Sequence, residues 1–142
     1  MKFSRTVAYA VQSLLQLAAA PDGAPVACGQ LAAEGQMPER FLLQILRKLV
    51  RCGLLVSHRG VDGGYSLARS LDEITLLDLF ESFDNPLIPS VPPLEGLSDQ
   101  ARRRMLEALS KGCAAVRSEL SAIKISDLQF SEEGPAGDSA PH

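Results

Sequence analysis

Residues 38–52 of this 142-residue chain form an amphipathic pattern that predicts a helix with one buried face. Apolar residues recur at intervals of three and four positions until Gly53, whose lack of a side chain suits a helix end. Pro38 and Glu39 suit a first helical turn, because that turn tolerates a missing N–H group and favours a negative charge. The opposite flank is polar and basic, and it consists of Arg40, Gln44, Arg47, Lys48 and Arg51.

The residues that follow predict a β-hairpin. Residues 54–59 have strand character, residues 60–64 contain three glycines that can adopt positive φ, and residues 65–68 alternate as a return strand. A hairpin directly after a basic helix is the wing of a winged helix-turn-helix. There the glycines let the backbone approach a phosphate, Arg59 enters a groove or neutralises a phosphate, and Tyr65 stacks or hydrogen-bonds at the base of the turn. A purely structural hairpin with an exposed arginine is the alternative, whereas a nucleotide-binding loop would need GxGxxG spacing and a following helix.

Two shorter helical patterns precede the basic helix. Residues 5–20 carry apolar positions at helical spacing, with Ser4 as an N-cap and residues 21–23, Pro-Asp-Gly, as a stop. Residues 29–34 form a second short pattern, and we expect Gly35 to end it in the left-handed conformation. A short helix, a tight turn and a second helix with an exposed basic face are the parts of a helix-turn-helix.

The C-terminal half divides into a buried helix over residues 74–83, a segment with four prolines, and a long helix that Ser98 caps and that continues almost to residue 124. Such a helix of about 25 residues is about 40 Å long, so much of its apolar stripe needs a partner, and a second copy is the simplest one. We therefore predict a DNA-binding domain at 1–83, a proline-rich linker or effector loop at 84–97, a dimerisation helix with a C-terminal segment at 98–130, and a disordered tail at 131–142.

The formal net charge of −3 hides an uneven distribution. Residues 38–70 hold six basic and two acidic side chains, whereas residues 71–142 hold six basic and thirteen acidic ones. A basic stripe inside an acidic protein is the expected footprint of a surface that binds a polyanion. A merely solvated helix face would give the same count, so charge alone leaves both interpretations open.

Composition narrows the function classes. The apolar runs are far too short to cross a bilayer and the N-terminus lacks a signal-peptide layout, so we expect a cytoplasmic protein. Three widely spaced cysteines form no disulfide framework, which fits a reducing compartment. Two histidines and no catalytic constellation of Ser, Cys or paired carboxylates argue against an enzyme.

The stretch PERFLLQILRKLVRCGLLVSHRGVDGGYSLAR, followed by ITLLDLFES, closely resembles the bacterial Rrf-type transcription regulators, and the two ends of residues 1–130 are similar to the same family. The resemblance implies a mainly α-helical fold with a small β-hairpin, in which a winged helix-turn-helix head precedes a long dimerisation helix. It also implies a homodimer whose two heads each read half of a near-palindromic operator in double-stranded DNA. The loop before the long helix often houses the sensor in this family.

Carried over by position, the resemblance places Ser4 and Arg5 on the DNA backbone, and Arg40, Phe41 and Gln44 on base edges and sugars. Many relatives have a glutamate where this chain has Leu43, so a different operator is expected. The full set of predicted DNA-binding residues is Ser4, Arg5, Pro38, Glu39, Arg40, Phe41, Gln44, Arg47, Lys48, Arg59, Gly60, Gly63, Gly64 and Tyr65.

Cluster-binding members of that family carry three cysteines between the fourth helix and the start of the long helix, because thiolates hold the iron. Residues 84–104 of this chain contain none, so we expect no iron–sulfur cluster, no other metal and no cofactor. Three cysteines elsewhere are redox candidates. Cys28 near a helix N-terminus would have a lowered thiol pKa, Cys52 would be a small buried side chain, and Cys113 would face its symmetry mate or pack within the subunit.

These observations predict a sequence-specific DNA-binding regulator that acts as a repressor and homodimer, with a protein or small-molecule effector of unknown identity. The alternative is a degenerate winged helix whose main partner is another protein. Binding of the DNA upstream of its own gene separates the two hypotheses, since a pure interaction module would not bind it.

Overall fold

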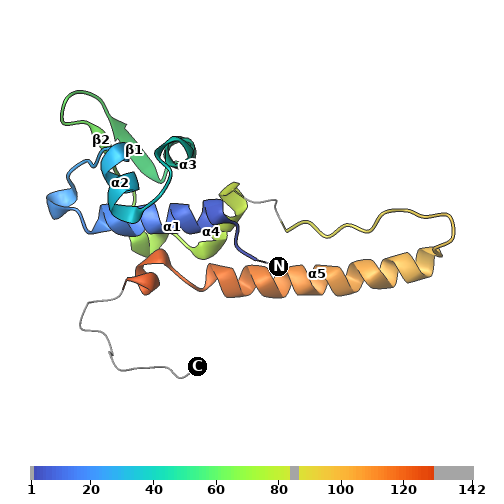
Figure 1. The fold of residues 1–142 in the computed structure, drawn as a ribbon. Coiled ribbons are helices and arrows are strands. Elements are labelled where there is room, and N and C mark those ends of the chain that lie inside the picture. Colours follow the sequence, from blue (N-terminus) through green and yellow to red (C-terminus); the bar gives the residue numbers. More distant parts are fainter. Residues whose placement is uncertain (1, 84–86, 130–142) are drawn as a thin grey trace, which may run out of the picture.

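The computed structural model describes residues 2–83 and 87–129, and it shows a helical head from which one long helix projects (Figure 1). The predicted tail at 131–142 and residues 84–86 of the predicted linker lie outside the described residues. The elements are α1 (Arg5–Ala18), α2 (Cys28–Gly35), α3 (Glu39–Arg51), β1 (Leu55–His58), β2 (Gly64–Leu67), α4 (Leu76–Phe83) and α5 (Asp99–Ser121), with short 3₁₀ turns η1 (Pro21–Gly23), η2 (Leu71–Glu73) and η3 (Ile125–Leu128). The mainly α-helical class with a small hairpin is confirmed.

The core of the head lies between α1, α2, α3 and α4. The buried face of α3 consists of Leu42, Ile45, Leu46 and Leu49, which follow the spacing that the sequence predicts. Helix α1 contributes its own buried stripe and starts at Ser4, whose Oγ accepts a hydrogen bond from the Val7 N–H at 3.2 Å. The hydrophobic stripes therefore fix α3 with its basic flank turned outward.

Gly35 does not end α2 in the left-handed conformation, so that prediction was wrong. Gln36 takes this conformation instead, with φ of 55°, and Gly35 stays within the helix. A Cβ atom at position 35 would lie 2.5 Å from Nε2 of Gln12, and that same amide donates a hydrogen bond to the Gly35 carbonyl at 2.8 Å. A side chain at position 35 would displace the ends of the Gln12 and Met37 side chains, which shows how closely α1 and α2 approach there.

The hairpin is an antiparallel pair in which Leu55 lies opposite Leu67. A third segment joins it, because the backbone of Val26 exchanges two hydrogen bonds of 2.9 Å with Tyr65. Gly64 has a φ of 148°, and a Cβ atom there would collide with the Val26 carbonyl. The hairpin is thus anchored at its base to the segment before α2, while its tip extends away from the head (Figure 1).

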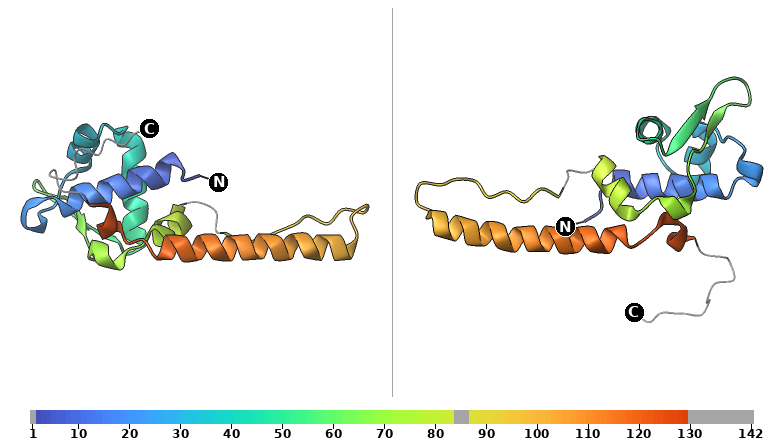
Figure 2. Two further views of the ribbon diagram at one scale, coloured as in Figure 1. Left: turned by 90° about the horizontal axis from the view of Figure 1, so that it is seen from below. Right: turned by 180° about the vertical axis from the view of Figure 1, so that it is seen from behind.

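The arm, defined as α5 together with residues 87–97, projects from the head, and its two parts run side by side (Figures 1 and 2). Ser98 caps α5, as predicted, by accepting the Ala101 N–H at 3.1 Å, and the helix ends at Ser121. The guanidinium Nε of Arg102 donates to the Val91 carbonyl at 3.0 Å, which ties the extended segment to the helix. None of the 23 residues of α5 is buried.

After α5 the chain returns to the head. The Leu76 N–H donates to the Ile123 carbonyl at 3.0 Å, and the Ile125 N–H donates to the Ile74 carbonyl at 2.8 Å. The Ile125 side chain is fully buried in the core. The structure thus adds residues beyond the long helix to the core of the head that was expected within residues 1–83.

Candidate DNA-binding surface

The outward face of α3 is an exposed ridge of long polar side chains. Arg40, Gln44, Arg47 and Arg51 are all exposed and follow one another at three- and four-residue intervals, opposite the buried leucines. Helix α3 and the hairpin lie on the side of the head away from α5 (Figures 1 and 2). The structure therefore brings the predicted helix and the predicted wing to one surface.

A groove flanks this ridge on each side. The wing groove, about 470 Å³ in volume, lies between α3 and the two strands and is lined by Arg47, Val50, Arg51, Ser57 and Tyr65. The Phe83 groove, about 260 Å³ in volume, lies between α3 and the ends of α1 and α4 and is lined by Thr6, Phe41, Gln44, Ile45, Lys48, Arg51 and Phe83. Basic side chains thus lie on both sides of the ridge, Arg47 and Arg51 in the wing groove and Lys48 and Arg51 in the Phe83 groove.

The tip of the hairpin exposes Arg59, Gly60 and Val61, and Val61 is fully exposed at 102%. Gly60 has a φ of 104° and open space around it. Glycine is favoured there because the turn requires a positive φ. Gly63 and Gly64 differ, because a Cβ atom at either position would collide with backbone of this same chain. Crowding within the chain therefore explains these two glycines, without the close phosphate approach that the sequence interpretation gave them.

The residues at the start of the two helices have structural partners. Glu39 lies against the N-terminus of α2, and its Oε2 is 3.3 Å from the point that a Cβ atom would occupy at Gly29. The dipole of α2 favours a negative charge at this end of the helix. Pro38 is the N-cap of α3. Ser4 caps α1 and is half-buried, while Arg5 beside it is exposed. Among these four predicted site residues, Arg5, Pro38 and Glu39 are exposed and Ser4 is half-buried.

Phe41 and Lys48 lie on the flank of α3 rather than on its ridge. The Phe41 ring makes an edge-to-face contact with Tyr9, with 5.8 Å between ring centroids. The Lys48 Nζ lies 5.5 Å from the centroid of the Phe83 ring. The sequence did not single out Thr6, Ser57 or Phe83 as site residues. They line the two grooves only because α1, β1 and α4 pack beside α3, and no local pattern shows this packing.

Two expectations about the cysteines were wrong. Cys52 is exposed instead of buried, since α3 ends at Arg51 and nothing among the described residues covers the position after it. Partial burial raises the pKa of the Cys28 thiol, the Glu39 carboxylate raises it further, and Arg47 lowers it less than these two raise it. The Cys28 Sγ also lies 3.8 Å from the Glu39 carbonyl, to which the protonated thiol donates. Cys113 is half-buried on α5.

The raised pKa predicts slow alkylation of Cys28 near neutral pH, because the thiolate is the nucleophile. Measured by mass spectrometry of iodoacetamide-treated protein over a pH series, the rate at Cys28 should rise at a higher pH than the rate of a free cysteine peptide. A rate curve displaced toward lower pH would contradict the arrangement described for this thiol.

The turn between α2 and α3, the exposed ridge of α3 and the hairpin together define a winged helix-turn-helix, the fold of proteins that read DNA through a helix in the major groove. The chain belongs to the Rrf2 family of transcriptional regulators. The family model, described as "Iron-dependent Transcriptional regulator", matches residues 3–130. The family and the relatives are regulators and not enzymes.

The similar proteins extend over most of the chain. A protein of Mycobacterium tuberculosis named as an HTH-type transcriptional regulator is 37% identical over 123 residues, which cover 87% of this chain and 75% of that protein. The structure of CymR, the global cysteine regulator of Bacillus subtilis, matches with a TM-score of 0.69 and 26% identity, covering 90% of this chain and 95% of that one. A regulator structure from Listeria innocua matches with a TM-score of 0.73 and 27% identity, covering 96% and 94%.

The family description names iron, and the residues that the structure describes do not form an iron site. Within residues 2–83 and 87–129, no three His, Cys, Asp or Glu side chains are grouped so that they could hold a metal ion. The three cysteines lie on separate helices or at their ends, in α2, after α3 and in α5. Iron–sulfur clusters are held by several thiolates at one place, and these three cysteines do not form such a set of ligands within one subunit. None of the described helices is long and apolar enough to cross a membrane.

Proposed function

We propose that this protein is a sequence-specific repressor that acts in the cytoplasm as a homodimer on a near-palindromic operator, without an iron–sulfur cluster. The observation that carries the proposal is the common surface formed by the basic ridge of α3 and the exposed hairpin tip. The ridge is long enough to place several side chains on base edges, and arginine and glutamine are the residue types that pair with guanine and adenine there.

The two grooves and the hairpin supply the remaining contacts. Arg47 and Arg51 line the wing groove with the Ser57 hydroxyl, which gives a phosphate both charge and a hydrogen-bond donor. Neither ion pair among the described residues, Arg69–Glu73 and Arg117–Glu81, involves Arg59, so its guanidinium is available at the tip. In this binding mode α3 lies in the major groove, and Arg59 enters the adjacent minor groove.

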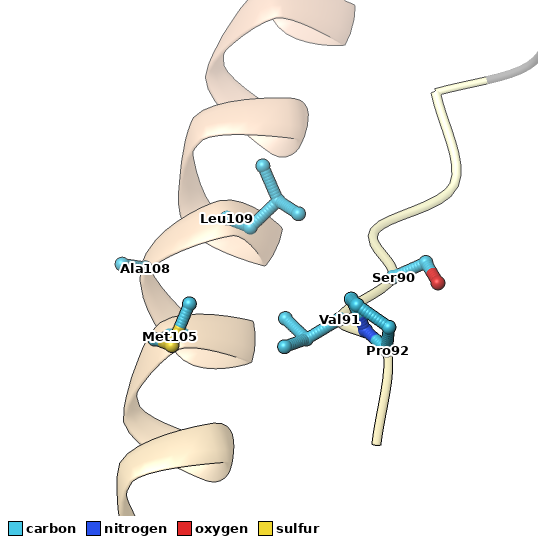
Figure 3. A pocket seen from close by; sticks show the side chains of 6 residues that line it. All are labelled: Ser90, Val91, Pro92, Met105, Ala108 and Leu109. Atoms are coloured by element: carbon cyan, nitrogen blue, oxygen red, sulfur yellow. The ribbon is translucent and has the colours of Figure 1, made fainter. Parts of the chain in front are cut away.

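The homodimer is supported by the arm. Residues 102, 106, 109, 113, 116 and 120 of α5 repeat at alternating intervals of four and three, the spacing of a helix seam that packs on another helix. Met105 and Leu109 remain 51% and 43% exposed in the single subunit. Beside them an open cavity of about 540 Å³ separates α5 from residues 90–92, with Val91 and Leu109 pointing toward one another across it (Figure 3). A second copy would cover this apolar surface and place two heads on two half-sites.

The test uses a DNA duplex from the region upstream of the protein's own gene. Fluorescence anisotropy measures binding of the protein to this duplex at several salt concentrations. Arg59→Ala should weaken binding by about 1–3 kcal/mol, because it removes a charged groove contact. Arg69→Ala is the matched control, since that arginine already pairs with Glu73 at 3.5 Å, and it should bind like the wild type.

Two results would overturn the proposed function. Binding that does not fall with salt would contradict phosphate neutralisation as the main source of affinity. Absence of any binding to this duplex, with the fold intact, would favour the protein-interaction module that the sequence also allows.

A further inference from the structure

In the Phe83 groove the ammonium group of Lys48 lies against an aromatic ring. Lys48 is half-buried, and its Nζ lies over the ring of Phe83, 5.5 Å from the centroid. An aromatic ring attracts a cation at this distance through its quadrupole. Neither ion pair among the described residues includes Lys48, so its charge is not neutralised by a carboxylate there.

The groove also supplies a site around that ammonium. Thr6 on α1 lines it with a hydroxyl group, Arg51 of α3 lines it with a guanidinium, and the Phe41 and Phe83 rings contribute apolar walls. A lysine ammonium has three N–H donors, and the ring face occupies one side of it. Among residues 2–83 and 87–129 no hydrogen bond or ion pair uses the remaining donors, which face a volume of about 260 Å³.

The position of Phe83 is itself set by contacts of α4. Phe83 is the last residue of that helix, and Glu81 on the same turn pairs with Arg117 of α5. The last turn of α4 therefore contacts α3 through one side chain and the arm through another. A ring attached to such a turn holds the lysine in one place, whereas a free lysine side chain would lose rotamer freedom on binding.

We propose that the Phe83 groove binds one phosphate of the DNA strand that borders the major groove on the side away from the wing, and that Phe83 is a positioning residue for Lys48. This inference rests on the proposed function, because it needs α3 in the major groove. Thr6 completes the site by donating a hydrogen bond from its hydroxyl group to the same phosphate, while Arg51 remains with the phosphate of the wing groove. Lys48 keeps its contact with the ring in the complex, so the ring lowers the entropy lost when the phosphate binds.

A double-mutant cycle with Lys48→Gln and Phe83→Leu tests this, using the same upstream duplex at several salt concentrations. Lys48→Gln removes one phosphate contact in each half-site, so it should reduce the slope of log K against log salt by about 1.8 for the dimer, about 0.9 for each phosphate. Phe83→Leu keeps the charge, so the slope should stay unchanged while binding weakens about two- to fivefold for each half-site, as the loss of one cation–π contact per subunit implies. In the Lys48→Gln background, Phe83→Leu should have no further effect.

Phe83→Tyr keeps an aromatic ring and should restore wild-type binding, and thermal melting of each variant checks the fold. An equal loss from Phe83→Leu in both backgrounds would show that Phe83 only packs, and would overturn the positioning role. Tighter binding by Phe83→Leu would mean that the ring competes with the phosphate, which also overturns it. If Arg59→Ala weakens binding while Lys48→Gln leaves the slope unchanged, this inference fails and the proposed function stands; if neither changes binding, the proposed function fails.

Discussion

Leu109→Asp is expected to convert the proposed dimer into monomers and to lower its affinity for a two-half-site duplex by about 10²- to 10⁴-fold. The side chain is 43% exposed in the single subunit and lies on the α5 seam, where a second helix would desolvate it. A buried carboxylate without a partner would oppose association strongly. Once the two heads are separate, the second half-site no longer binds at the high effective concentration that the dimer gives it.

Ala114→Asp is the matched control for this prediction. It introduces the same charge into the same helix at an exposed position outside the seam, so the dimer should persist. Sedimentation velocity gives the oligomeric state of both variants, and anisotropy gives their DNA affinity. A Leu109→Asp protein that remains dimeric would show that α5 does not pair the subunits along this stripe. A monomeric variant with full operator affinity would show that one head is sufficient for binding.

Ile125→Ala should lower the free energy of unfolding by about 2–5 kcal/mol, as expected for removing a large buried aliphatic side chain. Ile125 is 0% exposed and lies in the core beside α1 and η2, although it follows the arm in the sequence. The cavity left by alanine would be enclosed by residues that the hydrogen bond between Ile125 and Ile74 holds in place. The loss should therefore lie in the upper part of that range, about 2–5 kcal/mol.

Urea unfolding followed by circular dichroism at a fixed protein concentration measures this effect, because dimer stability depends on concentration. Val61→Ala is the control, since Val61 is fully exposed at the hairpin tip and should change stability little. An Ile125→Ala protein as stable as the control would mean that the C-terminal segment does not contribute to the core in solution.

The sequence predicted the parts of the fold that local patterns determine. The α3 boundaries and its buried face follow from apolar spacing, and the hairpin follows from a strand pattern around glycines. Gly35 shows the limit of such reasoning, because a glycine after a short helix suits both a left-handed end and a close helix contact. Only the position of Gln12 on α1 distinguishes these two roles.

The features that sequence reasoning missed depend on contacts between distant segments. The cation–π pair joins α3 to the end of α4, and an isolated β-bridge joins Val26 to Tyr65 of the hairpin. Cys52 was expected to be buried as a small hydrophobic side chain at the end of the helix, but burial depends on what other elements cover it. A periodic pattern identifies which residues share a face, whereas the grooves beside α3 depend on how α1, α4 and the strands pack around it.

The return of the chain after α5 limits how the subunit can move. The backbone pairing of Thr75 with Lys124 and the buried Ile125 fasten the end of the arm to the head immediately beside α4. Little freedom is left for a hinge at that end. In a two-fold assembly the separation of the recognition helices would then be a fixed length of the protein, and an altered number of base pairs between half-sites would have to be met by twisting or bending the duplex.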